Sequence, residues 1–238
     1  MIDGRRVLAV CPARGGSKGI PRKNLRPFLG VPLVARVGHL VREIPLVDRA
    51  VVSTDDPAIA EVARAAGLDA PFVRPEALSG DRIADAPVLQ QALEATERID
   101  GVRYDVVLML QPTSPLRRGE DVVGTLRMLV DGDWDAVWTV SPTDSKAHPL
   151  KQLVVEAGRL DWWDPKGAAI AARQQLTPVY HRNGVAYAIS RRCLVDGGSL
   201  MGPRTGAYVI EGETVSIDTL WDLELAELLQ RRREAEVR

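Results

Sequence analysis

A glycine-rich turn near the N-terminus carries a dense group of positive charges. Residues 7–24 read VLAVCPARGGSKGIPRKN, so a short apolar run leads directly into a turn that holds Arg14, Lys18, Arg22 and Lys23. Clustered cations and backbone N–H groups together satisfy and neutralise the oxygens of a polyphosphate. The first chemistry that this chain predicts is therefore the binding of a nucleotide.

The glycines of this turn match neither of the two common phosphate-binding fingerprints. In the Walker pattern G-x-x-x-x-G-K-[ST] the lysine follows the last glycine, whereas Lys18 precedes Gly19 here. The dinucleotide pattern G-x-G-x-x-G is also absent. We expect Gly15, Gly16 and Gly19 to give the backbone positive φ and a close approach to the ligand. A merely solvated connection is the alternative, but it gives no reason for glycines and cations to be this dense.

The composition excludes several classes of partner. The 238 residues carry a formal net charge of −1, which argues against a nucleic-acid partner bound through bulk charge. Apolar runs are far shorter than a membrane span, and the first residues lack the apolar region of a signal peptide. Cys11 and Cys193 show neither a metal-ligand spacing nor a disulfide framework. We therefore expect a cytoplasmic protein with no membrane partner.

Strand-like apolar runs alternate with helical patterns, which is typical of an α/β protein with a mostly parallel sheet flanked by helices. The expected strands cover residues 6–11, 50–53, 72–73, 104–110, 136–140, 185–190 and 207–210. The expected helices cover residues 33–42, 58–66, 86–97, 119–129 and 220–231. Helical periodicity fades between residues 141 and 192, where Trp162 and Trp163 favour packing or an interface. We expect one domain over residues 1–238, with an excursion at 141–192.

Polar residues that directly follow the strands are the candidate ligand contacts, because open α/β sheets bind ligands beyond the carboxyl ends of their strands. After the second strand come Asp55 and Asp56, and capping of the next helix by one or the other of them is favoured over a functional role. After the buried strand, residues 111–115 read QPTSP, and two prolines fix the backbone around an amide and two hydroxyls. This turn predicts rigid hydrogen-bonding groups and a plain helix start equally well.

A second acidic position precedes the last expected helix, where residues 216–219 read SIDT. A carboxylate such as Asp218, opposite a phosphate-binding turn, is the usual anchor for Mg²⁺, which prefers one or two carboxylates together with substrate oxygens. Capping of the helix is the alternative, and one residue can serve both purposes. The excursion adds His148, Lys151, Arg173 and Tyr180, none of which is diagnostic by itself.

In their order along the chain, these motifs resemble those of the acylneuraminate cytidylyltransferases, also called CMP-sialic acid synthetases. The resemblance covers nearly the whole chain and rests on ARGGSKGIPRKN at 13–24, VSTDD at 52–56, RP at 74–75, LQPTSPLR at 110–117, HPLK at 148–151, and Arg173-Gln followed by Tyr180. It implies a Rossmann-like nucleotidyltransferase fold and a homodimer in which the excursion reaches the partner's active site. It also implies transfer of CMP from CTP to the anomeric hydroxyl of a sialic-acid-like nonulosonic acid, with Mg²⁺ as cofactor and pyrophosphate as product.

The resemblance also implies roles for individual residues of this sequence. Nucleotide contacts are implied for Ala13, Arg14, Gly15, Gly16, Ser17, Asn24 and Arg74, with Arg14 and Asn24 at the cytosine or ribose. The implied catalytic set is Lys18 and Lys23, which would hold the triphosphate, and Asp218, which would bind the metal. Contacts to the acceptor sugar are implied for Gln111, Thr113, Ser114, Lys151, Arg173 and Tyr180, the last three near its carboxylate and ring.

Three places depart from the family pattern. Ser216 stands where the family usually has the first aspartate of Asp-x-Asp, although the related Kdo cytidylyltransferases also keep only one aspartate there. His181 stands where an arginine is expected, and residues 76–85 lack the usual run of small hydroxyl residues. A Kdo-like or other acidic acceptor therefore stays open, as does a non-catalytic nucleotide-binding homologue. The intact cations of the turn favour an active enzyme.

Overall fold

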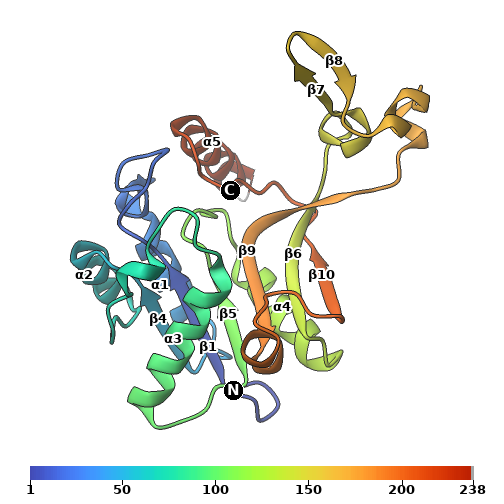
Figure 1. The fold of residues 1–238 in the computed structure, drawn as a ribbon. Coiled ribbons are helices and arrows are strands. Elements are labelled where there is room, and N and C mark those ends of the chain that lie inside the picture. The colour runs from blue at the N-terminus through green and yellow to red at the C-terminus, as the bar shows by residue number, and fades with distance from the viewer. Residues whose placement is uncertain (237–238) are drawn as a thin grey trace.

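A six-stranded sheet runs through the middle of the protein, with helices on both of its faces (Figure 1). The computed structural model describes residues 1–236. The strands of this sheet are β1 Val7–Pro12, β4 Arg49–Ser53, β5 Val106–Met109, β6 Ala136–Pro142, β9 Tyr180–Ser190 and β10 Thr205–Val209, in the order β10–β6–β9–β5–β1–β4. β1 pairs in parallel with β4 and β5, and β6 pairs in parallel with β10, whereas β9 is antiparallel to both of its neighbours. The expected α/β class is confirmed.

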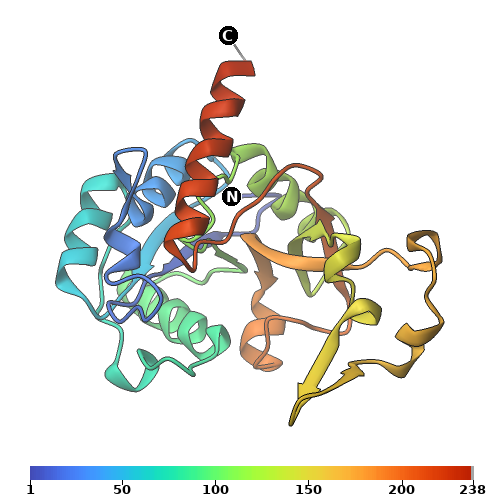
Figure 2. The ribbon, with the colours of Figure 1, turned by 90° about the horizontal axis from the view of Figure 1, so that it is seen from above.

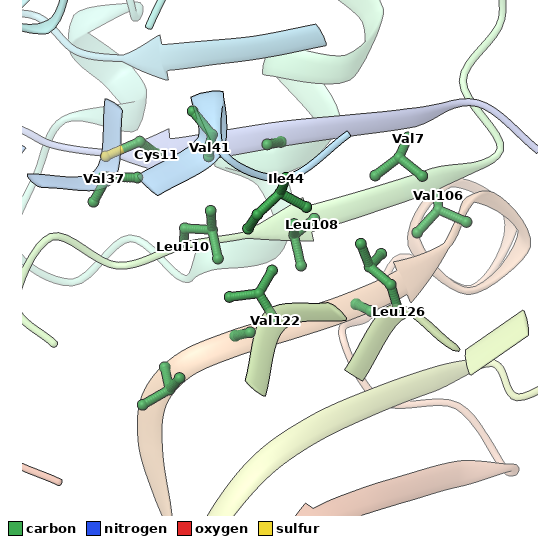
Figure 3. Close-up of a cluster of buried hydrophobic side chains, with 14 of the residues drawn as sticks. Val7, Cys11, Val37, Val41, Ile44, Val106, Leu108, Leu110, Val122 and Leu126 are labelled. Atoms are coloured by element: carbon green, nitrogen blue, oxygen red, sulfur yellow. The ribbon is translucent and has the colours of Figure 1, made fainter. Parts of the chain in front are cut away.

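Helices cover both faces of the sheet, so its strands are buried on both sides. One face carries α1 Leu33–Arg42, α2 Pro57–Ala66 and α4 Gly119–Asp131, and the other carries α3 Asp85–Asp100 and a π-helical turn at Arg192–Asp196. Side chains of β1 alternate between the two faces, because successive residues of a strand point to opposite sides. Val7 and Cys11 lie in the cluster under α1 and α4 (Figure 3), and Leu8 and Val10 lie under α3. Burial on both faces explains why β1 and β5 are continuously apolar in sequence.

A third apolar cluster fixes the C-terminal helix, α5 Leu220–Glu236, to the rest of the molecule. Leu229 and Ala226 of α5 pack with Ile20, which lies in the glycine-rich turn, and with Ile217, which lies just before α5. The cluster thereby holds the turn and the segment around Asp218 close together. Figure 2 shows that the C-terminal end of α5 extends beyond the body of the protein. No helix within residues 1–236 combines the length and the apolar character that crossing a membrane requires.

The chain leaves the sheet after β6 and returns to it in β9. Between them lies an antiparallel hairpin of β7 Leu153–Glu156 and β8 Arg159–Trp162, which stands away from the sheet (Figures 1 and 2). Ala157 and Gly158 at its tip have φ of 49° and 82°, which is the geometry of a two-residue type I′ turn. Because residues 180–190 form β9 in the sheet, the segment outside the sheet is 143–179.

One local prediction is contradicted by the structure, and one short hairpin was not predicted. No strand forms at residues 72–73; instead Asp69 makes a single bridge to Val51 of β4, and Val73 is exposed. Pro71 and Pro75 flank this segment, and proline cannot donate to a strand ladder. The short hairpin of β2 Pro27–Phe28 and β3 Val31–Pro32 was not expected from sequence. Its turn places Leu29 and Gly30 at φ of 48° and 82°.

Candidate active site

A cavity of about 620 Å³ opens beyond the carboxyl ends of β1 and β5. The structure brings the following predicted site residues together in its lining: Arg14, Ser17, Lys18, Lys23, Asn24, Arg74, Gln111, Thr113 and Asp218. They come from the glycine-rich turn, from the segment after β4, from the QPTSP turn after β5 and from the segment before α5. These four segments are distant in sequence and meet because the sheet places their strand ends at one edge.

The glycines of the turn serve close packing. The expectation that Gly15, Gly16 and Gly19 take positive φ is wrong, since their φ angles lie outside the left-handed region. A Cβ atom on Gly19 would overlap the carbonyl oxygen of Asp218, and one on Gly15 would lie 2.9 Å from Cβ of Asp56. A Cβ atom on Gly16 would meet open space. Gly15 and Gly19 are thus required because Asp56 and Asp218 approach the turn too closely to leave room for a side chain.

Asp81 neutralises two cations of the turn. Its Oδ1 lies 2.6 Å from Nη1 of Arg14, and its Oδ2 forms an ion pair with Nζ of Lys18. These hydrogen bonds, first from Lys18 and then from Arg14, hold the pKa of Asp81 below its ordinary value. Sequence reasoning missed Asp81, although its position a few residues after Arg74-Pro75 placed it in a segment that was already marked as unusual. An anionic group of a ligand could therefore replace the carboxylate of Asp81 as the partner of Arg14 and Lys18.

Lys23 and Asp218 form the second charged pair of the cavity. Nζ of Lys23 donates to Oδ1 of Asp218 and to the carbonyl oxygen of Ile217, both at 2.8 Å. The capping role considered for Asp218 belongs to Thr219, whose Oγ1 accepts from the N–H group of Asp222 at 3.2 Å. Oδ2 of Asp222 accepts in return from the N–H groups of Thr219 at 2.7 Å and Asp218 at 3.0 Å. The carboxylate of Asp218 is 76% exposed and so stays available to a ligand beside Lys23.

Arg74 is the most deeply buried cation of the lining, at 5% exposure. Its Nε donates to Oγ of Ser53 at 3.0 Å, and its Nη2 donates to the carbonyl oxygen of the same residue at 2.5 Å. Burial lowers the pKa of Arg74, while the negative charge of Asp55 acts in the opposite direction. The side chain is therefore fixed at the end of β4, and the part of its guanidinium that faces the cavity is presented rigidly.

Of the two aspartates after β4, Asp56 caps the next helix as predicted, whereas Asp55 supports the glycine-rich turn instead. Oδ1 of Asp56 accepts from the N–H groups of Ala58 at 2.8 Å and Ile59 at 3.4 Å, which caps α2. Oδ1 of Asp55 accepts from the N–H group of Gly15 at 2.8 Å. Asn24 also braces the turn, because its Nδ2 donates to the carbonyl oxygen of Arg14 at 2.9 Å.

The QPTSP turn divides its polar groups between the cavity and the interior. Gln111 and Thr113 line the cavity, whereas Ser114 is buried and donates from Oγ to the carbonyl oxygen of Asn183 at 2.9 Å. Arg117 holds the turn from beneath, with Nη2 donating to the carbonyl oxygens of Gln111 at 2.6 Å and Gly184 at 3.1 Å. Burial lowers the pKa of Arg117 to about 10. The turn is thus bound to the start of β9 on its inner side and presents rigidly held hydrogen-bonding groups to the cavity.

The predicted acceptor contacts on the excursion lie outside the cavity lining. Lys151 is the last residue of the short 3-10 turn Pro149–Lys151, and Tyr180 begins β9 and is 51% exposed. Arg173 borders a separate cavity of about 270 Å³. Within one chain, the structure does not bring these three side chains to Gln111 and Thr113. Their roles stay predictions.

The fold and the site together define an α/β nucleotidyltransferase. The chain belongs to the cytidylyltransferase family, whose pattern matches residues 8–233. This confirms the family resemblance.

Two curated relatives match over nearly their whole length. Pseudaminic acid cytidylyltransferase of Campylobacter jejuni is 30% identical over 227 residues, which cover 94% of this chain and 96% of the relative. CMP-N,N'-diacetyllegionaminic acid synthase of Legionella pneumophila is 31% identical over 234 residues, which cover 97% and 99%. Among solved structures, CMP:2-keto-3-deoxy-manno-octonic acid synthetase complexed with CTP matches 96% of this chain and 99% of its own, with a TM-score of 0.69 at 21% identity, which establishes the shared fold.

Proposed function

We propose that this protein transfers CMP from CTP to the anomeric hydroxyl of a nonulosonic acid, a nine-carbon 2-keto acid sugar, and releases pyrophosphate. The observation that carries the proposal is the cavity itself, which places a cation-rich turn, an exposed carboxylate and a rigid polar turn around one volume in a member of the cytidylyltransferase family. The relatives named for pseudaminic and legionaminic acids support an acceptor of this class.

The charged pairs of the cavity match the needs of the triphosphate. Arg14 and Lys18 would exchange their ion pairs with Asp81 for pairs with phosphate oxygens, and Lys23 would reach the phosphates from beside Asp218. The acceptor hydroxyl would attack the α-phosphate in line while pyrophosphate leaves toward the turn, so the chain's contribution is positioning and charge neutralisation. A covalent thiol intermediate has no support, because Cys11 and Cys193 are buried and neither lines the cavity. Burial also raises the pKa of the Cys11 thiol to about 12.

The residues present fit Mg²⁺ as the cofactor. Asp218 offers an exposed carboxylate that is not used as a helix cap. Within residues 1–236 no group of three or more His, Cys, Asp or Glu side chains is placed to hold a metal ion. Mg²⁺ commonly takes one or two carboxylates and completes its shell with water and substrate phosphates, so Asp218 with the triphosphate suffices. When bound, the ion would neutralise phosphate charge.

A homodimer would complete the acceptor side of the cavity. Lys151, Arg173 and Tyr180 lie on the segment that leaves the sheet, and in one chain they are outside the cavity. The hairpin of that segment exposes Val155 and Leu160, at 69% and 64%, which is apolar surface suited to a second copy of the chain. We include in the proposal that the excursion delivers these three side chains to the partner's cavity, near the acceptor carboxylate.

Pyrophosphate release tests the proposed reaction. The purified protein is supplied with CTP, Mg²⁺ and, separately, neuraminate-, legionaminate-, pseudaminate- and Kdo-type acids. The proposal predicts turnover with at least one nonulosonic acid, and that acid names the acceptor. Turnover with the Kdo-type acid alone would contradict the nonulosonic acceptor, and silence across the panel while CTP still binds would contradict catalysis.

A further inference from the structure

The QPTSP turn also borders a second, smaller cavity, whose volume is about 180 Å³. Ser114 and Pro115 line this cavity, whereas Gln111 and Thr113 line the candidate active site. Pro112 borders both. Most of the remaining lining comes from α1, and none of the cations of the glycine-rich turn belongs to it. The second cavity is therefore separate from the proposed catalytic volume but shares one wall with it.

Arg36 of α1 lines this cavity with a guanidinium group that the protein satisfies poorly. Its Nε is buried and has no hydrogen-bond partner within residues 1–236, and its Nη2 makes one long hydrogen bond, 3.4 Å, to the carbonyl oxygen of Pro115. Its Cζ lies 4.6 Å from the centre of the Phe28 ring. Burial lowers the pKa of Arg36, while the charge of Glu234 acts in the opposite direction. Such a cation is costly to the free protein unless an anion reaches it.

Arg117 adds a second cation to the same cavity. Its Nε donates to the carbonyl oxygen of Val185, and its Nη2 donates to those of Gln111 and Gly184, which leaves Nη1 without a partner in the described part of the chain. Burial is the main cause of the lowered pKa of Arg117, and the positive charge of Arg36 lowers it further. Two desolvated cations that repel each other share one small volume, so an anion bound between them would stabilise both.

The size and the rim of the cavity decide which anion fits. A nucleotide or a nine-carbon sugar acid needs more room, since pockets for ligands of that size hold about 300–1,000 Å³. His39 is exposed at the rim and can donate a hydrogen bond, and Glu43, also exposed, is the only carboxylate of the lining within residues 1–236. Guanidinium groups match the oxygens of phosphate in geometry and charge. A small inorganic oxyanion therefore suits the cavity best.

We propose that this cavity binds inorganic phosphate or pyrophosphate through the guanidinium groups of Arg36 and Arg117, with His39 at its entrance. The two anions share the chemistry that the site recognises, and pyrophosphate would be the product of the proposed reaction. None of the three side chains is assigned to CTP or to the acceptor sugar. The inference therefore goes beyond the proposed reaction and does not depend on it.

Thermal unfolding and calorimetry test this site, with phosphate, pyrophosphate and chloride added separately at equal ionic strength. A ligand that binds only the folded protein raises its melting temperature, so phosphate or pyrophosphate should raise it above the value in chloride. Arg36→Met keeps an apolar side chain over Phe28 but removes the charge, so the affinity for the anion should fall by about ten- to a hundredfold. In chloride this variant should melt no lower than the parent, because it removes a poorly satisfied cation.

Three further variants complete the test. Arg127→Gln is the matched control, because Arg127 is an exposed arginine of α4 outside both cavities, and it should bind the anion as the parent does. Lys23→Ala removes a cation of the glycine-rich turn and leaves the second cavity intact, so binding there should persist. Arg36→Lys replaces the methionine variant if that variant folds poorly. It keeps the charge but loses the forked donor group, so the affinity should fall by about threefold or more.

The outcomes separate this inference from the proposed reaction. A parent protein that neither anion binds or stabilises at millimolar concentration would overturn the inference, as would equal affinities in the parent and in the Arg36 variants. Binding that is lost in Lys23→Ala and kept in Arg36→Met would place the anion at the glycine-rich turn and contradict the inference. A parent that binds either anion through Arg36 and yet releases no pyrophosphate with any acid would uphold the inference and contradict the reaction.

Discussion

At the residue scale, the carboxylate of Asp218, paired with Lys23, is the proposed ligand of the metal ion. Asp218→Ala is expected to lower the turnover number by at least about a hundredfold, because a carboxylate that holds a catalytic metal contributes several kcal/mol to the transition state. The fold should survive, since this side chain is 76% exposed and a surface substitution usually changes stability by less than about 0.5 kcal/mol. Pyrophosphate release at saturating Mg²⁺ and thermal unfolding measure the two effects.

Asp131→Ala is the matched control for that experiment, because Asp131 is an exposed aspartate at the end of α4, outside the cavity lining. It should keep parental rates. If Asp218→Ala turns over as fast as this control, the carboxylate does not hold the metal, and the proposed cofactor site is wrong.

At the element scale, the glycine-rich turn and the segment before α5 are held together by contact. Gly19→Ala is expected to destabilise the protein by about 1–3 kcal/mol, because the added Cβ atom overlaps the backbone of Asp218 and one of the two segments must shift. Turnover should fall as well, since that shift separates Lys23 from Asp218. Gly16→Ala is the control in the same turn and should leave the melting temperature unchanged or slightly raised, because its Cβ atom meets open space. Equal melting temperatures for the two variants would argue against this contact.

The same turn shows how far sequence reasoning reaches. The apolar run of β1, the capping of α2 and the cations of the turn that line the cavity follow from apolar patterning, capping preference and strand ends, which are local properties of the chain. The reason for Gly15 and Gly19 does not, because the atoms that crowd them belong to Asp56 and Asp218, far along the sequence. Asp81 was missed for the same reason, since its partners Arg14 and Lys18 are brought to it only by the fold.

At the scale of the whole molecule, the proposed dimer predicts that two inactive variants rescue each other. Lys23→Ala damages the cavity of its own chain, whereas Arg173→Ala damages the side chain that its chain delivers to the partner. After mixing under subunit exchange, half of the dimers would be mixed and would hold one intact site, so activity should reach about a quarter of the parental value. Each variant measured alone is the control. A mixture no more active than the better single variant would contradict the exchange of the excursion between subunits.

The antiparallel strand β9 connects this prediction to the fold. The excursion at 143–179 leaves from β6 and returns in β9 without a crossover helix, and a connection of that kind yields an antiparallel pair. Helical periodicity that fades after residue 141 indicated the excursion, but nothing local indicated that its return strand would enter the middle of the sheet. The position of β9 in the sheet depends on its pairing with β5 and β6, which the residues of β9 alone do not specify.

The most direct test of the central claim identifies the products. The protein is incubated with CTP, Mg²⁺ and the acid that supported pyrophosphate release, and phosphorus NMR follows the phosphorus-containing products. Transfer of CMP predicts one phosphodiester signal from the CMP-sugar and an equal amount of pyrophosphate, with neither CDP nor inorganic phosphate. Formation of CDP, or pyrophosphate accompanied by free CMP and no phosphodiester, would show that the cavity does not join CMP to the sugar and would contradict the account.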